Sequence, residues 1–368
     1  MLLLLMGLYG FPLLAVAANR LAIGVPAHGA GAIGKTVHLV AGSGSTGLLL
    51  LIGRRRATAV AALVLIGSGL LFLLVGLGEG AEDLLAAGLG AMRASLASGA
   101  WITLVVLGTG TVWAIRDCRV GGLGIAVAIV LGVALLFAGR TGFFDHLSLA
   151  VEFQARRALV AEAVLQHLIL AGGALALAIL LAVAASLWRR GQGIVEIAVS
   201  GIQVVPAVAL FGALVAMASA LLKAVPAMRE AGFSALGPGP ALIGIAAYLL
   251  LPLWRGLAAG LGGTDAAILD AAKAMGLSRT QVLMRVRLPL GAPVLIGALR
   301  VAAVQSLGLA TLGALVGAGG LGRIVFDGMA QFAPDLILLG ALPIVALSLV
   351  AETALSALEA KARTWWSA

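Results

Sequence analysis

The stretch that decides the fold of this chain is DAAKAMGLSRTQVLMRVRLP, residues 270–289. It lies inside a polar insertion, residues 257–290, between two long apolar segments. In the first half of the insertion, apolar residues such as Ile268 and Met275 recur at helical spacing, and Thr264 is placed to cap the start of that helix. The insertion therefore begins with a short amphipathic helix.

A turn and a second helix follow. Gly276 stands where a helix commonly ends on a left-handed residue. Ser278 and Gln281 fit the reciprocal S-x-x-Q capping box at the start of a second helix, which Pro289 is expected to end. One interpretation is that the insertion is a loop that folds only to connect the two apolar segments on either side of it. Its small-residue apolar face has no membrane to cover it, however, and this favours a surface for a protein partner.

The composition places the rest of the chain in a membrane. Of 368 residues, 62% are hydrophobic and 11% charged, and the mean hydropathy is +1.15, whereas soluble domains carry roughly 25% charged residues. This excludes a soluble enzyme, a disordered chain and a secreted disulfide scaffold. A spanning helix needs about 20 mainly apolar residues. Ten stretches come near that length: residues 2–18, 37–53, 57–78, 99–115, 121–138, 167–186, 195–217, 239–256, 291–316 and 336–358. The fold class is therefore all-α, a polytopic inner-membrane protein with about ten transmembrane helices.

Basic residues indicate how these helices cross the membrane. With the N-terminus inside, the links after the second, fourth, sixth and eighth stretches and the C-terminal tail carry the whole formal charge of +9. Among these basic residues are Arg54, Arg119, Arg189 and Arg190. Because cytoplasmic loops carry an excess of Lys and Arg, both termini and the insertion at 257–290 are expected in the cytoplasm. Orientation and anionic lipid explain the charge, and no nucleic-acid partner is expected.

Residues 2–18 admit a second interpretation. Their length also suits the core of a signal peptide, and Ala15-Val16-Ala17 resembles a cleavage site. No Lys or Arg precedes this apolar run, which favours an uncleaved first helix. The orientation of the remaining helices is the same in either case.

A polar stretch divides the chain. Residues 1–138 hold five short-linked apolar segments, and residues 139–166 are polar, with 151–164 as a candidate surface helix on the outer side. The domain boundary is placed near residue 160. Residues 1–160 then form an N-terminal membrane-helix extension of about five helices plus an outer polar loop, and residues 161–360 form a core that carries the insertion. Small residues at four-residue spacing throughout the chain indicate close helix packing.

Two nucleotide-binding patterns occur in unsuitable places. GAGAIGKT at residues 29–36 fits the P-loop pattern, but no strand is expected before it and an apolar segment follows. GAGGLG at residues 317–322 fits the dinucleotide fingerprint, yet it lies between membrane helices, where a tight turn is expected. Glu82 and Asp83 are expected in a solvated outer loop. No catalytic residue, metal ligand or cofactor is expected in this chain, because the sequence holds neither a nucleophile motif nor a ligand-like His or Cys cluster.

Polar side chains inside the apolar stretches are expected to face the protein interior, since burial in lipid is costly unless they are hydrogen-bonded. Gln203, Gln305 and Ser306 are such groups, and Pro206 breaks the helix beside Gln203. They line a pathway or form interhelical hydrogen bonds, and the sequence leaves both open. Glu352, in the last apolar stretch, is expected to pair with a cation or to extend toward the membrane surface.

Residues 270–289 resemble the EAA loop of ABC importer permeases, which reads E-A-A, three residues, G, nine residues, I-x-L-P. Asp270 replaces Glu and Val286 replaces Ile, and the remaining motif positions match. The resemblance implies a C-terminal ABC type I importer permease core, whose first short helix docks into a cleft on a separate ATPase subunit. It assigns ATPase coupling to Asp270, Ala271, Ala272, Gly276, Leu288 and Pro289. ATP would be used by that partner, with no cofactor in this chain.

A narrower resemblance covers about residues 160–360. GIQVVPAVALF at 201–211, the segment 248–256 and the Gly-rich 317–322 are similar to permeases of osmoprotectant importers, which carry glycine betaine, choline and related quaternary amines. Ala207 departs from the serine usual in that family. We expect the translocation pathway near Gln203, Pro206, Phe211, Tyr248 and Gln305. The first five helices resemble the N-terminal extension of a long-form branch of these permeases.

The resemblance also implies the partners. They are an ABC ATPase subunit, a second permease chain that is the same or homologous, a periplasmic or lipid-anchored solute-binding protein, and membrane lipid of the cell inner (plasma) membrane. Aromatic residues are only 5% of the chain, too few to assign a cage for a quaternary ammonium, so specificity is expected mainly in the binding protein. Two alternatives remain: an ABC permease for amino acids such as methionine, and an ion-coupled secondary transporter, which would not need the capped insertion.

Overall fold

The computed structural model describes residues 1–19, 22–53, 55–86, 92–117, 121–188 and 191–366. Arg54, Arg119, Arg189 and Arg190, which helped to predict the orientation, lie outside these residues. Seven helices in the described residues are long and apolar enough to cross a membrane. A multi-pass helical membrane protein is therefore confirmed, whereas the number of about ten spanning helices is not.

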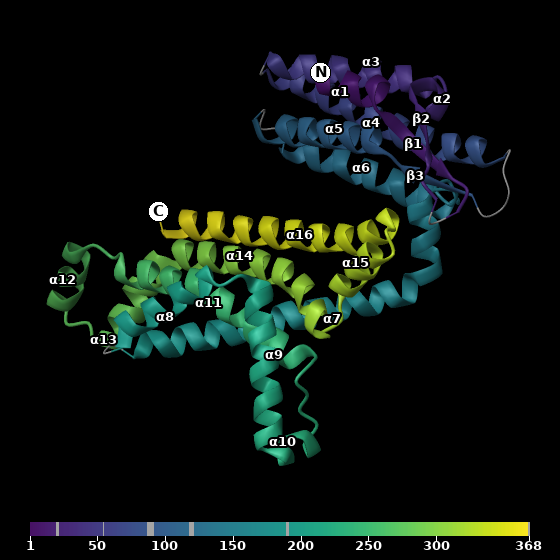
Figure 1. Ribbon diagram of the computed structural model, residues 1–368. Coiled ribbons are helices and arrows are strands. Elements are labelled where there is room, and N and C mark those ends of the chain that lie inside the picture. The colour runs from purple at the N-terminus through teal and green to yellow at the C-terminus, as the bar shows by residue number, and fades with distance from the viewer. Residues whose placement is uncertain (20–21, 54, 87–91, 118–120, 189–190, 367–368) are drawn as a thin grey trace. The chain divides into compact units, whose positions relative to one another are not determined.

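The chain folds into two compact units (Figure 1). The first comprises Met1–Arg156 with Gln331–Asp335, and the second comprises Arg157–Ala330 with Leu336–Ala368. The helix α7, Ser148–Leu187, begins in the first unit and continues into the second, and its backbone leaves helical angles at Arg156. The expected separate surface helix at 151–164 is wrong, because this segment is part of α7.

The first unit is mainly helical. Its helices are α1 (Leu2–Leu5), α2 (Gly29–Ile33), α3 (Thr36–Ile52), α4 (Arg56–Ala86), α5 (Ser98–Asp117), α6 (Gly121–Arg140) and the start of α7. α3 and α4 approach closely, since a Cβ on Gly47 would lie 2.7 Å from the Ile66 side chain. α4 continues past its apolar run, so Glu82 and Asp83 lie on the exposed side of a helix and not in the expected loop.

A small antiparallel sheet replaces most of the first predicted membrane helix. β1 (Pro12–Ala17) lies between β2 (Val25–His28) and β3 (Arg93–Leu96). The helical part of residues 2–18 ends before Pro12, which has no backbone N–H to continue it. The following apolar residues are buried as a strand, with Leu13 and Leu14 fully covered. A spanning helix at residues 2–18 is therefore wrong, and this unit is not purely α-helical.

The second unit is a helical bundle. After α7 come α8 (Gln192–Val204), α9 (Ala207–Ala224), α10 (Pro226–Glu230), α11 (Pro238–Gly262), α12 (Ala266–Ala274), α13 (Arg279–Val282), α14 (Leu288–Gly313), α15 (Leu321–Ala330) and α16 (Pro334–Trp366). The single helix expected at 195–217 is two helices, because the chain breaks at Val205 and Pro206. Within this unit α9 runs away from the other helices and ends at α10 (Figure 1).

Glycines let α11 and α14 pack backbone against backbone. A Cβ on Gly291 of α14 would overlap the carbonyl oxygen of Gly260 on α11, and a Cβ on Gly256 would overlap Ala298. Gly256 and Gly260 are four residues apart and therefore share one face of α11. The prediction that small residues mark close helix packing is confirmed for this pair of helices.

Candidate functional site

The insertion forms a helix, a turn and a second helix at one end of the second unit (Figure 1). α12 begins at Ala266, and Asp265 Oδ1 accepts a hydrogen bond of 2.8 Å from the backbone N–H of Ala267. The predicted cap at Thr264 is wrong by one residue, because Asp265 caps the helix. The Oγ1 of Thr264 is buried without a hydrogen-bond partner within the described ranges. A carboxylate one residue later fits the cap because Asp accepts from the backbone and favours the positive end of the helix.

The turn after α12 has the predicted geometry. Gly276 has φ +78, and its N–H donates to the carbonyl of Lys273 at 2.9 Å. The N–H of Leu277 donates to the carbonyl of Ala272 at 3.2 Å. These two hydrogen bonds are those of a Schellman motif with glycine in the left-handed position. Gly276 therefore reverses the chain as expected.

The capping box at the start of the second helix is also confirmed. The N–H of Ser278 donates to Gln281 Oε1 at 2.8 Å, and the N–H of Gln281 donates to Ser278 Oγ at 3.3 Å. α13 therefore starts with two of its free backbone N–H groups satisfied by this pair.

The second helix does not end at Pro289. A π-helical turn, Leu283–Arg287, joins α13 to α14, and Pro289 is the second residue of α14. In this wider turn the N–H of Leu288 reaches back to the carbonyl of Leu283, so the chain passes the proline without a break. The predicted end is wrong, and the helical segment that follows the turn at Gly276 is continuous with a membrane helix.

The surface of α12 combines a buried contact with exposed apolar groups. Ala272 is 1% exposed, while Ile268 and Met275 are 44% and 71% exposed. Asp270 and Lys273 form an exposed ion pair of 2.9 Å. This surface, with Ala271 also exposed, offers an apolar patch that no other described part of the chain covers.

Three of the expected pathway residues meet where α8 ends and α9 begins. Gln203 Nε2 donates to the carbonyl of Tyr248 on α11 at 2.6 Å. The hydroxyl of Tyr248 donates to the carbonyl of Val205, next to Pro206. Of the two alternatives for Gln203, the structure shows an interhelical hydrogen bond. The backbone freed by the proline is thereby satisfied from a neighbouring helix, as lipid requires.

The other two expected pathway residues lie elsewhere. Phe211 on α9 is 1% exposed, and its ring fills the space that a Cβ on Gly244 of α11 would need. Gln305 is half-buried on α14. Ser306 is buried and bonds within its own helix, donating to the carbonyl of Ala303 at 2.8 Å. A pathway role for these residues stays a prediction.

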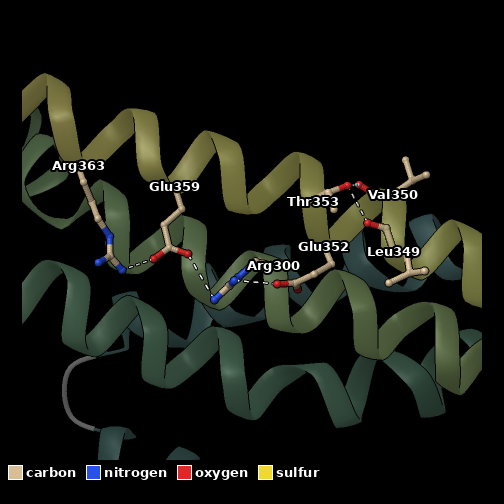
Figure 2. A network of polar contacts seen from close by, with 7 residues as sticks. All are labelled: Arg300, Leu349, Val350, Glu352, Thr353, Glu359 and Arg363. Carbon is tan, nitrogen blue, oxygen red and sulfur yellow. Dashed lines mark hydrogen bonds and ion pairs between the residues drawn. The ribbon is translucent and has the colours of Figure 1, made fainter. Parts of the chain in front are cut away.

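A charged network links α14 to α16 (Figure 2). Arg300 Nη1 donates to Glu352 Oε1 at 2.8 Å, and Nη2 lies 3.5 Å from Glu359 Oε2. Arg363 also donates to Glu359. The expectation that Glu352 pairs with a cation is confirmed. The charges lie between helices and are mutually neutralised, which is how ionised groups are accommodated in apolar surroundings.

A second polar contact was not foreseen from the sequence. His167 is fully buried on α7, and its Nε2–H donates to the carbonyl of Leu307 on α14 at 2.9 Å. Its neighbour Gln166 accepts from the N–H of Gly320 at 3.0 Å. Gly317, Gly319 and Gly320 all have positive φ, so the predicted tight turn at 317–322 is confirmed. For the bond between His167 and Leu307, the sequence offered one signal, a histidine inside an apolar stretch. It gave no indication of the partner, which lies 140 residues away.

The P-loop pattern at 29–36 has a context that differs from the expectation. Strand β2 does precede it, so that part of the prediction is wrong. The segment itself forms α2 and a turn at Gly34, beside a pocket of about 450 Å³. Glu79 and Asp83 line this pocket, and their carboxylates oppose the binding of a nucleotide phosphate.

Two family models match the chain. Residues 1–150 match a model described as ABC transporter permease YehY, N-terminal domain. Residues 159–364 match one described as binding-protein-dependent transport system inner membrane component. The second match covers more than half of the chain and contains the turn at Gly276 and both polar networks of the second unit.

Several curated proteins are similar to part of this chain. Carnitine transport permease protein OpuCB of Listeria monocytogenes is 39% identical over 127 residues, 34% of this chain and 58% of the relative. Choline transport system permease protein OpuBB of Bacillus subtilis (strain 168) is 32% identical over 126 residues, with the same two shares. The chain thus matches less than two thirds of the length of these two. Glycine betaine/carnitine/choline transport system permease protein OpuCD of Bacillus subtilis (strain 168) is 32% identical over 173 residues, 47% of this chain and 69% of the relative.

One solved structure is similar to part of the chain. The MetNI methionine ABC transporter in an inward-facing conformation has a TM-score of 0.47 and 17% identity, covering 56% of this chain and 97% of that one. The family match and the matched relatives, together with the capped turn at the expected spacing, lead to one conclusion. This chain belongs to the family of binding-protein-dependent transport system inner membrane components, the permease subunits of ABC transporters.

Proposed function

We propose that this chain is the membrane-spanning subunit of an ATP-driven importer of quaternary-amine osmoprotectants such as glycine betaine or choline. The observation that carries the proposal is the turn at Gly276, which we call the coupling turn. It presents α12 with an exposed apolar patch, and the helical segment that follows it runs without a break into membrane helix α14. The solute class rests on the relatives, whose names include carnitine, choline and glycine betaine.

The proposed division of labour has three further partners. A separate ATPase docks on α12 and hydrolyses ATP, a second permease chain completes the pathway, and a solute-binding protein delivers the solute. Closure of the ATPase then favours one of two membrane conformations, which is alternating access by differential binding. Residues 161–360 form the permease core in this proposal, and residues 1–160 form an extension to which we assign no step.

The orientation of the chain in the membrane is part of the proposal. With the C-terminus in the cytoplasm, a reporter inserted between Thr264 and Asp265 is cytoplasmic, and one inserted at Gly232, between α10 and α11, is external. If the reporter at Thr264 proves external, α12 cannot contact a cytoplasmic ATPase and the proposal is contradicted.

The direct test is transport by vesicles that contain this chain, its ATPase and its binding protein. They are expected to accumulate glycine betaine or choline chemically unchanged, and only with ATP. Uptake that persists without ATP when an ion gradient is imposed identifies a secondary transporter. Uptake of methionine in preference to quaternary amines identifies the amino-acid alternative, and recovery of a modified solute contradicts a transport role.

A further inference from the structure

A basic groove lies beside the coupling turn. Its volume is about 640 Å³, and it runs between the end of α12 and the helical segment that starts with α13. Three cationic side chains line it together with apolar ones: Lys273, Arg279 and Arg287, with Leu277, Val282 and Leu283. No carboxylate is among the groove's described lining residues.

The cations of the groove are not all neutralised by the chain itself. Lys273 pairs with Asp270 at the exposed edge. Arg287 lies at the end of the π-helical turn, and its Nε is buried without a hydrogen-bond partner in the described part of the chain. A buried donor of this kind costs free energy until an acceptor reaches it. The groove therefore has the chemistry of a site for an anionic group.

The groove adjoins the exposed face of α12. Lys273 and Leu277 line the groove, and Met275, between them in the sequence, is 71% exposed. Met275 and the groove therefore belong to one short segment, and an interface of ordinary size, about 800 Å² on each partner, is large enough to contact both. The alternation of guanidinium and aliphatic groups suits an amphipathic protein segment with a carboxylate, because Arg binds carboxylates through two parallel N–H groups.

We propose that this groove receives an acidic segment of the ATPase subunit, whose carboxylates pair with Arg279 and Arg287 while its apolar side chains contact Leu277 and Leu283. The inference rests on the proposed function and specifies the chemistry of the ATPase surface. The α12 patch supplies apolar contact, and the groove supplies charge that fixes the orientation of the partner.

The test measures affinity of the ATPase for the full-length chain in detergent. Arg279→Glu and Arg287→Glu are each expected to raise the Kd at least tenfold, and the wild-type Kd is expected to rise with salt more steeply than that of either variant. Arg285→Glu is the matched control. It makes the same charge change two residues from Arg287, at an exposed position outside the groove lining, and is expected to change the Kd less than twofold.

The outcomes separate this inference from the proposed function. If Gly276→Val weakens ATPase binding but both groove variants bind like wild type, the coupling turn stands and the acidic partner segment is wrong. If a groove variant keeps its ATPase but loses copurifying anionic phospholipid, the occupant is a lipid headgroup, which also overturns the inference. Should Arg287→Glu not fold, Arg279→Glu, at an exposed position of α13, decides. A wild-type chain that binds no ATPase contradicts both proposals.

Discussion

Arg300 on α14 and Glu352 on α16 form an ion pair of 2.8 Å across 52 residues of sequence. The same guanidinium reaches Glu359, two helical turns further along α16 (Figure 2). One side chain therefore holds α16 at two points. Because α14 continues directly from the coupling turn, this pairing connects the last membrane helix to the segment that we propose as the ATPase contact.

Arg300→Gln is expected to destabilise the contact between α14 and α16. Glu352 loses the pair with Arg300, and Glu359, whose side chain is 10% exposed, keeps its pair with Arg363. A charged hydrogen bond such as that between Arg300 and Glu352 contributes roughly 1.5–3 kcal/mol, and less where solvent screens it, as at Glu352, whose side chain is 44% exposed. With an unfolding entropy of about 2 cal/mol/K per residue, each kcal/mol lowers the melting temperature of a chain of this length by about 1 °C. The measurement is thermal unfolding in detergent. Arg323→Gln is the control, because the pair of Arg323 and Asp327 is exposed at 3.8 Å and is expected to contribute little; equal losses in the two variants would contradict the prediction.

Gly276→Val is expected to weaken ATPase binding while the membrane helices still insert. At φ +78 the new Cβ meets open space, so the main cost is backbone strain, roughly 1–2 kcal/mol for a non-glycine residue, and a β-branched side chain is especially unfavourable at such an angle. Asn tolerates left-handed angles better, so Gly276→Asn should lose less. Ser278→Ala removes one cap, worth about 1 kcal/mol, and should be mild. Copurification of the ATPase and ATP-dependent uptake are measured for all three, and a Val variant that matches wild type in both refutes the role of the turn.

Gly291→Ala is expected to reduce the yield of folded protein. The added methyl group overlaps the carbonyl oxygen of Gly260, which is backbone and cannot rotate away, and overpacking of this kind costs about 1–3 kcal/mol. Gly308→Ala, on the same helix, places its methyl group in open space and serves as the control. Monodisperse yield after solubilisation distinguishes them, with Gly308→Ala expected at the wild-type level.

The substitutions Gln203→Leu and Gln305→Leu are expected to have different effects on stability and uptake. Gln203 bonds to the carbonyl of Tyr248, so its loss should lower both the melting temperature and the rate of uptake. Gln305 is half-buried, and no hydrogen bond to its side chain is found in the described residues. If Gln305 lines the pathway, its variant should transport more slowly at unchanged stability. A Gln305 variant with wild-type uptake removes that residue from the predicted pathway.

Local hydrogen bonding explains which features the sequence predicted well. The turn at Gly276 and the capping box of Ser278 and Gln281 are closed by groups at most five residues apart, so the residue types alone define them. The cap at Thr264 was misplaced by one residue because Thr264 and Asp265 are both good caps. Apolar length predicted α4 and α11, since a run of about 20 apolar residues has few alternatives to a helix in lipid.

Non-local partners explain what the sequence did not predict. Residues 12–17 are apolar enough for a membrane helix. They form a strand instead because β3 pairs with one edge of β1, and β3 lies almost 80 residues away in the sequence. The bond between His167 and Leu307 spans 140 residues. Glu352 could be assigned a cation in general, whereas the choice of Arg300 depends on how α14 and α16 pack. A single sequence carries no information on such pairings.

The unbroken passage of the chain through Pro289 has a mechanical consequence. From Arg279 to Gly313 the helical segment, at about 1.5 Å per residue, forms a rod about 50 Å long. A tilt of about 5° imposed at its cytoplasmic end displaces the opposite end by about 4 Å, several times the water radius of about 1.4 Å. In the proposed function, a small displacement of the segment next to α12 is thereby magnified across the bilayer, and the leverage depends on the stiffness of this one rod.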